Sequence, residues 1–338
     1  MRRLLVATQQ VDPAHPTLGA TASLVRALAE RVDEVVVMCS AATLDGLPSN
    51  VRVRSFAAPT QALRGARFEA GLAGELFRGR PDALLAHMSP VYALLAAPVL
   101  RPLGVPVLLW FTQQRGGPNL ARAARVVDAI LSVDARSVPL ASSKIRAIGH
   151  GVDTSMFACA PRPPAEGSLR LLSLGRYSDV KGHDVAVRAL GSLPHAELTV
   201  RGEEATPADV HVRARLEKLA QDLGVADRVQ LLDAVPRSQV PELFAAADVV
   251  VNATHGASAD KVVFEALSSC VPVIAASPVF DSLLPAALRF ADGEPDALAV
   301  AARAAVALTE EDRRGLRARV EAEHSVGHWA DEVLAMAR

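Results

Sequence analysis

The sequence predicts an α/β protein built from two doubly wound halves. Short apolar runs alternate with amphipathic stretches along most of the 338 residues, which is the pattern of parallel sheets with crossover helices. The pattern breaks at residues 156–168, which hold three prolines and a glycine, and then starts again. A chain of this length is typical of about two domains.

The first half of the sequence alternates runs that predict strands with stretches that predict helices. The expected strands are apolar runs at 3–7, 34–39, 51–56, 83–86, 105–111 and 129–133. The expected helices are rich in Ala, Leu and Arg and lie at 21–31, 66–78, 92–103 and 120–127.

The second half repeats this alternation and ends in a helical tail. The expected strands lie at 169–174, 196–201, 229–232, 249–252 and 272–275. The expected helices lie at 183–193, 210–223, 240–246 and 261–269, and the tail 309–338 reads as helix broken near 325–327. We therefore expect an N-terminal Rossmann-like domain at 1–158, a second one at 159–310 and tail helices at 311–338. Two such domains would face a central cleft, because open α/β sheets bind ligands at the carboxyl ends of their strands.

Composition and charge limit the classes of function. Apolar residues make up 50% of the chain and charged residues 22%, which is typical of a globular protein and excludes a disordered one. The net charge of −1 argues against a nucleic-acid-binding protein. Residues 1–166 hold 18 basic and 12 acidic residues, or +6, and residues 167–338 hold 18 and 25, or −7.

The basic balance of the first half has two interpretations. One is a surface that faces an anionic partner, either an acidic acceptor or a phospholipid surface. The basic residues that lie close together in one stretch are Arg64, Arg67, Arg78 and Arg80. The other interpretation is an uneven distribution of surface charge with no functional meaning.

Neither a membrane span nor a disulfide is expected. The longest apolar stretch, 92–111, is interrupted by three prolines and Arg101, and the first residues lack the apolar segment of a signal peptide. The three cysteines, Cys39, Cys159 and Cys270, are odd in number and far apart. They match no metal or disulfide spacing, so we expect a protein of the reducing cytoplasm.

The first segment that indicates chemistry is the loop 175–183, between an expected strand and an expected helix. It places Arg176 and Lys181 between two glycines, Gly175 and Gly182. Cations and exposed backbone N–H groups at a helix start suit a diphosphate. Only four of the 36 basic residues are lysines, so a lysine here favours a compact point charge. The alternative is a surface loop with two solvated cations.

The second segment is 255–267, where a loop of small residues opens a helix. Lys261 and Glu265 are four residues apart, so they share one face of that helix. The helix start can bind phosphate or sugar hydroxyls, and a carboxylate accepts two hydrogen bonds from a ribose. The alternative is a pair of solvated charges.

Together these segments resemble the retaining glycosyltransferases of family 4, a bacterial group 1 family with the GT-B fold. Residues 175–182 resemble its G-R-x4-K-G loop, and 265–274 resemble its E-A-M-x-x-G-x-P-V signature. Further similar stretches are 8–19, with T-Q-Q-V-D and Leu-Gly, 149–153, with G-H-G-V-D, and 227–248, with D-R-V and A-A-A-D.

The resemblance assigns roles to single residues. Arg176 and Lys181 would be the catalytic pair that binds the donor diphosphate and stabilises the leaving group. Glu265 would hold the nucleotide ribose. The remaining donor-binding residues would be Gly19, Gly202 and Lys261. The family uses no metal ion or cofactor, and no Asp-x-Asp motif occurs in this sequence. The resemblance also implies that the acceptor binds to the first domain and that the tail helices cross back to it.

The sequence departs from the family at several positions. Ala257 stands where the family has the first of two glutamates, and Gln113 follows the strand after which many members carry a histidine. Cys270 and Asp233 stand where glycine is usual. The acceptor-side candidates are His87, Gln113 and His150, although a structural role is an equal alternative for His87 and a turn-fixing role is favoured for His150. For His183 the simplest expectation is a helix cap.

The resulting prediction is an enzyme that moves a sugar from a nucleotide-diphosphate sugar to a hydroxyl of a carbohydrate, lipid-linked or small-molecule acceptor. We expect it in the cytoplasm, with peripheral contact at the inner membrane face as a further hypothesis. One alternative is a catalytically silent GT-B protein that binds a nucleotide sugar or a partner glycosyltransferase. The other is a dinucleotide-dependent oxidoreductase, but residues 8–21 contain only Gly19 where that class needs G-x-G-x-x-G.

Overall fold

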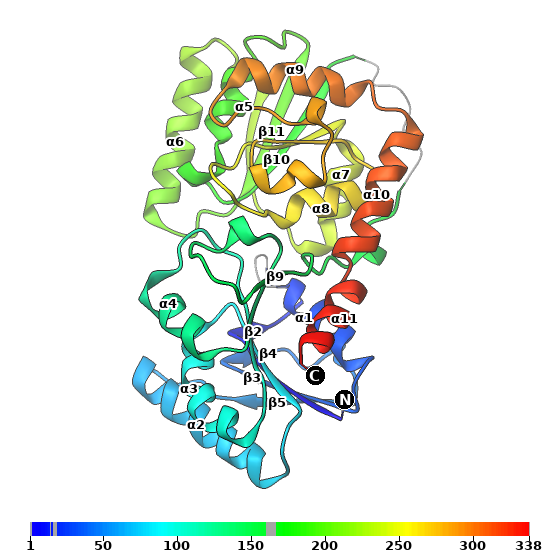
Figure 1. Ribbon diagram of the computed structural model, residues 1–338. Helices are drawn as coiled ribbons and strands as arrows, with labels where there is room; N and C mark the ends of the chain where they lie inside the picture. Colours follow the sequence, from blue (N-terminus) through cyan, green and yellow to red (C-terminus); the bar gives the residue numbers. More distant parts are fainter. Residues whose placement is uncertain (1, 14, 16–18, 160–166, 338) are drawn as a thin grey trace. The chain divides into compact units, whose positions relative to one another are not determined.

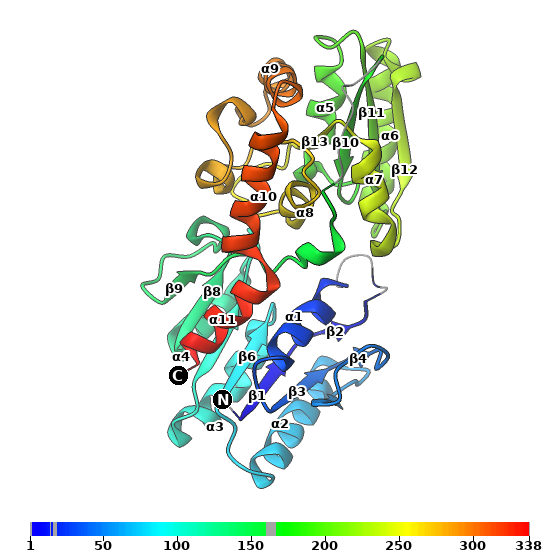
Figure 2. The same cartoon turned by 90° about the vertical axis from the view of Figure 1, so that its right-hand side faces the viewer.

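The computed structural model describes residues 2–13, 15, 19–159 and 167–337. The chain divides into two compact units (Figures 1 and 2). Unit 1 consists of Met1–Gly151 and Glu323–Arg338, and unit 2 consists of Val152–Ala322. The expected boundaries at 158 and 310 therefore both lie inside unit 2. Each unit is an α/β structure around one parallel sheet, as the alternating sequence pattern predicts.

Unit 1 contains a sheet of seven parallel strands in the order β5-β3-β1-β6-β7-β8-β9. Their bounds are β1 Arg3–Ala7, β3 Glu34–Cys39, β5 Val51–Ser55, β6 Ala83–His87, β7 Val107–Trp110, β8 Ala129–Ser132 and β9 Ile145–Ala147. Two short strands, β2 (Gln10–Val11) and β4 (Ala41–Ala42), pair beside it. All six expected strands are confirmed, whereas β2, β4 and β9 are too short to leave a pattern in the sequence.

Within the described residues, unit 1 has five α-helices. They are α1 Ala20–Ala29, α2 Gln61–Phe77, α3 Pro90–Leu100, α4 Gly117–Val126 and α11 Val326–Met336. Helix α2 begins earlier than expected because the Thr60 side chain accepts a hydrogen bond from the backbone N–H of Leu63 and caps the helix. Helix α11 packs against α1 and buries Trp329 edge-on to Trp110, with 5.6 Å between ring centroids. Both tryptophans are core residues.

Two glycines of the segment 149–151 allow the last part of unit 1 to pack closely. Gly149 and Gly151 both have left-handed backbone angles, with φ of 77° and 72°. A Cβ atom on Gly149 would lie 2.0 Å from the carbonyl oxygen of Glu323, and one on Gly151 would collide with Leu24. The G-H-G sequence is therefore required for the packing of residues 323–337 in this unit.

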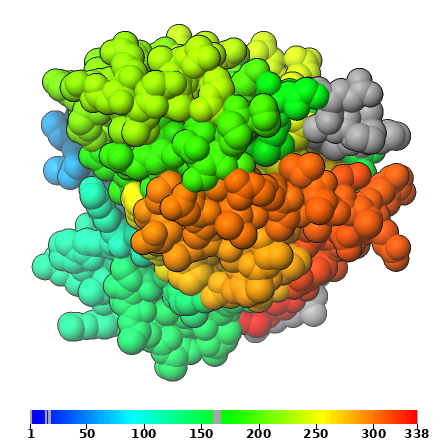
Figure 3. Space-filling model, turned by 90° about the horizontal axis from the view of Figure 1, so that it is seen from above, coloured from blue at the N-terminus to red at the C-terminus, as the bar shows by residue number. Residues whose placement is uncertain are grey.

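Unit 2 contains five parallel strands in the order β12-β11-β10-β13-β14. Their bounds are β10 Leu169–Leu174, β11 Ala196–Gly202, β12 Val229–Asp233, β13 Val249–Asn252 and β14 Val273–Ala275. The helices are α5 His183–Ala189, α6 Pro207–Asp222, α7 Val240–Ala246, α8 Lys261–Ser268, α9 Pro295–Val306 and α10 Glu310–His324. Helix α5 packs against both α6 and α9, and Figure 3 shows the orange surface of α9 beside green residues of this unit.

Candidate functional site

The residues singled out in unit 2 gather at the carboxyl ends of two neighbouring strands. Residues 175–182 follow β10, and residues 253–260 follow β13 and lead into α8. The chain runs from β10 to β11 and β12 on one side and returns to β13 on the other. This is the topological switch point of the sheet, where open α/β structures bind ligands.

Lys181 and Asp260 connect these two segments. The Lys181 Nζ lies 2.8 Å from the Asp260 Oδ2, and both side chains are largely buried. The same oxygen accepts hydrogen bonds from Asn252 and Thr254, while Ser258 donates to Oδ1. Burial raises the pKa of Asp260, but the Lys181 charge and these donors outweigh it and hold the pKa below its usual range. Asp260 is therefore a charged carboxylate that fixes the lysine.

His183 anchors the loop that carries Arg176. Its side chain is buried, its Nδ1 lies 3.0 Å from the Ser173 hydroxyl, and its Nε2 lies within 3.3 Å of the carbonyl oxygens of Gly175 and Arg176. Burial lowers its pKa to about 4, so the imidazole is neutral and Nε2–H is the donor to the carbonyls. The expectation of a helix cap is wrong: the side chain makes no cap hydrogen bond and instead fixes the preceding loop.

Glu265 lies on α8 and is paired with a cation that the sequence did not indicate. The Arg237 Nη1 lies 2.7 Å from the Glu265 Oε1, an ion pair without hydrogen-bond geometry, and both side chains are buried. The Arg237 guanidinium also lies over the Phe157 ring, 5.8 Å from its centroid. Burial lowers the pKa of Lys261 to about 8, with the Glu265 charge acting in the opposite direction. Lys261 therefore remains mostly charged at neutral pH.

Two other expected donor residues lie at the same edge. Gly202 ends β11, and a Cβ atom there would lie 2.0 Å from the carbonyl oxygen of Gly175, so only glycine fits beside this loop. Arg176 is exposed on the loop that follows Gly175. The structure thus brings together Arg176, Lys181, Gly202, Lys261 and Glu265 at one edge of the unit 2 sheet. Gly19, which precedes α1, belongs to unit 1.

The three acceptor-side candidates also belong to unit 1. His87 ends β6, is buried, and has its Nδ1 3.2 Å from the Thr8 hydroxyl. His150 is buried with its ring 6.3 Å from that of Trp110. Gln113 is exposed in the connection between β7 and α4. These positions fit structural roles for both histidines.

The four arginines expected to form a basic cluster have separate roles. Arg67 donates to the carbonyl of Ala57, and Arg80 donates to that of Gly104 at 2.7 Å. Arg64 is in the first turn of α2 and Arg78 follows its last turn, about 20 Å away along a helix that rises 1.5 Å per residue.

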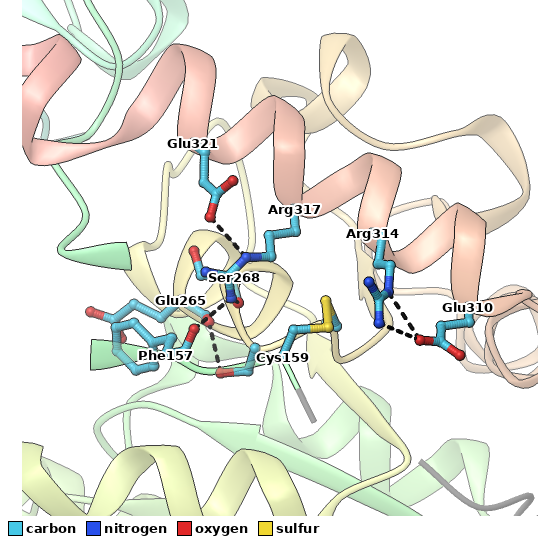
Figure 4. Close-up of a disulfide and its surroundings, with 10 residues drawn as sticks. Phe157, Cys159, Glu265, Ser268, Glu310, Arg314, Arg317 and Glu321 are labelled. Carbon is cyan, nitrogen blue, oxygen red and sulfur yellow. Dashed lines mark hydrogen bonds and ion pairs between the residues drawn. A yellow bond between two sulfur atoms is a disulfide. The ribbon is translucent and has the colours of Figure 1, made fainter. Parts of the chain in front are cut away.

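Cys159 and Cys270 form a disulfide, which corrects the expectation of three unpaired cysteines (Figure 4). The bond crosslinks residues 111 positions apart, and such a pairing arises from the fold and not from local spacing. Cys270 follows the end of α8 with φ of 56°, the left-handed conformation that explains why glycine is usual there. Arg317 of α10 donates to the carbonyls of Phe157 and Ser268, so it joins the same two segments.

A cavity of about 610 Å³ in unit 2 is lined by α5, α6, residues 178–180 and His255. Its charged residues pair with one another, as Arg215 does with Asp179 and Lys218 with Asp222. Neither Lys181 nor Glu265 is among the residues that line it. We therefore place the site at the strand ends and not in this cavity.

Three residues of the site are partners of the motif residues that the sequence did not predict. From the sequence, Asp260 and Arg237 have no assigned partner, and His183 is expected to be a helix cap. The position of Arg237 just after β12 is a signal that it could reach the site, because the carboxyl ends of parallel strands lie at the same edge of a sheet.

Among the described residues, no group of histidine, cysteine and acidic side chains is arranged to hold a metal ion. No helix in the described ranges has the length and apolar character needed to cross a membrane.

Comparison with known proteins gives one family match. Residues 160–281 match the family model "Glycosyl transferases group 1". A D-inositol 3-phosphate glycosyltransferase of Mycobacterium leprae is 29% identical over 198 residues, and one of Mycolicibacterium gilvum is 32% identical over 167. These matches cover 56% and 46% of this chain, but only 40% and 35% of the relatives.

Solved structures match over nearly the whole chain. Anabaena HepE in complex with UDP-glucose superposes with a TM-score of 0.78 at 17% identity, covering 99% of this chain and all of HepE. Sucrose-phosphate synthase of Thermosynechococcus elongatus gives 0.77 at 16% identity, covering 99% and 98%. The chain therefore has the GT-B fold, and the comparisons together support the group 1 glycosyltransferase family for it.

Proposed function

We propose that this chain is a retaining glycosyltransferase of family 4. It moves a sugar from a nucleoside-diphosphate sugar to an acceptor hydroxyl without a metal ion or a cofactor. The observation that carries the proposal is the Lys181–Asp260 pair at the switch point of the unit 2 sheet, next to Arg176 and the start of α8. Cations and helix N–H groups there suit a leaving diphosphate.

Lys181 and Arg176 would stabilise the charge that develops on the diphosphate. Asp260 stays ionised and holds the ammonium group of Lys181 in place, so the lysine is preorganised before the donor binds. The neutral His183 holds the carbonyls of Gly175 and Arg176, which fixes the loop on which both cations lie. Preorganised charge is worth more than charge that must be repositioned during the reaction.

Glu265 would accept hydrogen bonds from the ribose hydroxyls. The ion pair with Arg237 fixes the carboxylate through Oε1. The nearby Lys261 adds positive charge at the start of the same helix. Donor recognition would thus combine a charged diphosphate loop with a carboxylate for the sugar of the nucleotide.

The reaction exchanges one bond at the anomeric carbon of the sugar. The bond from that carbon to the diphosphate oxygen breaks, and a bond to the acceptor oxygen forms on the same face. The acceptor proton goes to the departing phosphate, since the site residues named above include no evident general base. The transferred sugar therefore keeps its anomeric configuration.

Donor binding and turnover test the proposal in order. HepE was solved with UDP and with UDP-glucose, so UDP and UDP-sugars are the first probes. The purified full chain should show a higher melting temperature with the correct nucleoside diphosphate, because a ligand of the native state raises stability. Proton NMR of the product should show an anomeric configuration equal to that of the donor. Inversion would contradict the retaining mechanism, and binding without turnover on any acceptor would favour a silent binding protein.

Contact with an anionic membrane is a separate proposal, supported by the +6 balance of residues 1–166. Sedimentation with anionic vesicles at low and high salt tests it, because exposed charges are screened beyond about 10 Å at 0.1 M. No sedimentation at low salt would contradict it.

A further inference from the structure

A second cavity lies in unit 1, and none of the donor-binding residues assigned above is among the residues that line it. It measures about 430 Å³ and opens at the carboxyl ends of three neighbouring parallel strands. Gln9 and Gln10 follow β1, Ser40 follows β3, and Ser89 follows β6. The chain leaves β1 toward β3 on one side and returns to β6 on the other, so the cavity lies at the switch point of this sheet. Its size is that of a small-molecule site.

The lining of this cavity is polar but largely uncharged. Amide and hydroxyl groups come from Gln9, Gln10, Ser40, Gln61, Ser89 and Asn119. Each of these side chains both donates and accepts hydrogen bonds, as does each hydroxyl of a polyol. Val91 and Leu95 add an apolar surface for C–H groups, and no carboxylate is among the described lining residues.

Arg64 is the one cation among the described lining residues of the cavity. It lies half-buried in the first turn of α2, and its Nε is buried with no hydrogen-bond partner within the described part of the chain. Its charge acts on the neighbouring Tyr92, where burial raises the pKa of the phenol and Arg64 opposes the rise. Arg67 and Arg80, by contrast, already bind backbone carbonyls. This leaves a charged N–H donor at the cavity from which an anionic ligand can accept a hydrogen bond.

We propose that this cavity binds a polyol that carries one phosphate group. Arg64 binds the phosphate, and the amide and hydroxyl side chains bind the hydroxyl groups. The assignment rests on the proposed function, in which this molecule is the sugar acceptor. None of the acceptor-side candidates expected from the sequence lines the cavity. The phosphate belongs either to a soluble polyol phosphate or to the headgroup of a phospholipid.

Binding without nucleotide tests the cavity separately from the transfer reaction. Calorimetry on the full chain would use myo-inositol 1-phosphate and glucose 6-phosphate, their unphosphorylated parents, and inorganic phosphate. We expect at least one phosphorylated polyol to bind ten-fold or more tightly than its parent and than phosphate alone. Equal affinity for inorganic phosphate would overturn the polyol assignment, and equal affinity for the parents would overturn the phosphate assignment.

Two variants of α2 make the test specific. Arg64→Gln should weaken binding ten-fold or more, whereas Arg78→Gln, at the exposed far end of the same helix, should leave it unchanged. Arg64→Lys keeps the charge without the planar fork and should fall between them. Unchanged melting temperatures would show that both glutamine variants fold. Full affinity in a folded Arg64→Gln variant would overturn the proposal.

A vesicle arm separates the two sources of the phosphate. If the protein binds phosphatidylinositol vesicles through Arg64 but does not bind soluble inositol phosphate, the phosphate belongs to a lipid headgroup. Transfer then separates this proposal from the proposed function. Arg64-dependent binding without sugar transfer would support the binding site in the cavity and contradict the proposed glycosyltransferase activity. The opposite result is an Arg64→Gln variant that transfers sugar to the same phosphorylated acceptor with the wild-type KM. It would support the glycosyltransferase activity and contradict the binding site in the cavity.

Discussion

Lys181 and Asp260 are 79 residues apart in the sequence and form an ion pair with 2.8 Å between Nζ and Oδ2. The pair joins the loop after β10 to the start of α8, the two segments that carry the family-like motifs. Its function is therefore both structural and electrostatic, and the two contributions can be measured separately.

Lys181→Ala should lower kcat/KM by about 30-fold to 900-fold, because it removes a charge that the transition state needs, on the order of 2–4 kcal/mol. It should also lower the free energy of unfolding by about 1–3 kcal/mol, since Asp260 then lacks its cation but keeps three other donors. Lys218→Ala is the matched control, an exposed lysine paired with Asp222. Turnover near the wild-type rate in Lys181→Ala would remove this residue from the site.

Asp260→Asn should destabilise the protein at neutral pH, and this destabilisation should become smaller as the pH falls below about 4. The folded-state pKa of Asp260 lies below its unfolded value of about 4, so the carboxylate contributes stability above pH 4 and loses it as the pH falls further. Urea unfolding of both proteins from pH 7 to pH 3 measures this difference. A difference that stays constant over that range would contradict the charged pair.

His183 should make the free energy of unfolding depend on pH in a range above that of Asp260. The unfolded chain binds a proton near pH 6.5, whereas the folded chain does so only near pH 4, so stability is complete above 6.5 and falls between these values. The shift corresponds to about 3 kcal/mol. His183→Gln, which keeps a donor for the carbonyls, should lose this pH dependence. His211→Gln, at an exposed position, should retain it. The same slope in His183→Gln as in the wild type would refute the assignment.

Glu265 variants should affect the nucleoside diphosphate itself. Glu265→Gln keeps one acceptor oxygen and should weaken UDP binding modestly. Glu265→Ala should cost about 1–3 kcal/mol, because the ribose hydroxyls lose their acceptor and Arg237 loses its ion-pair partner. Titration calorimetry with UDP measures both. Glu310→Ala, in an exposed pair with Arg314, is the control. Wild-type affinity in Glu265→Ala would exclude the ribose role.

The disulfide should account for a large part of the stability of unit 2. Closing a loop of 111 residues is worth about 4–5 kcal/mol in the chain-entropy model. Cys159→Ser or dithiothreitol should lower the urea midpoint accordingly, and dithiothreitol should have no further effect on Cys159→Ser. Cys39→Ser should stay sensitive to reductant, because Cys39 is a separate buried thiol. An unchanged midpoint under reduction would contradict the crosslink.

Cys270 allows a finer comparison, because its backbone is left-handed. Cys270→Gly and Cys270→Ala both lose the disulfide, but only glycine adopts this conformation without steric cost. Cys270→Gly should therefore be more stable by about 0.5–1 kcal/mol. The reverse order of melting temperatures would contradict the left-handed conformation.

Local patterns in the sequence were sufficient to predict both sheets and the loops at their edges. Strand β3 occupies the expected residues because its apolar run from Val35 to Cys39 is continuous. The partners within the site were not predictable in this way. Arg237 meets Glu265, Lys181 meets Asp260, and Cys159 meets Cys270 only after β10, β12 and β13 are aligned in one sheet. Helix α2 began earlier than expected because a single capping residue, Thr60, determines its start.

The packing of α11 on α1 has a consequence for synthesis on the ribosome. Unit 1 is completed by residues 323–337, which are translated after all of unit 2. Trp110 meets Trp329 in the core only when that last helix has emerged, although the sheet of unit 1 is made first. Unit 2 is one continuous segment, so it can finish folding while unit 1 still lacks α11. The half of the chain that is made first is thus the half that matures last.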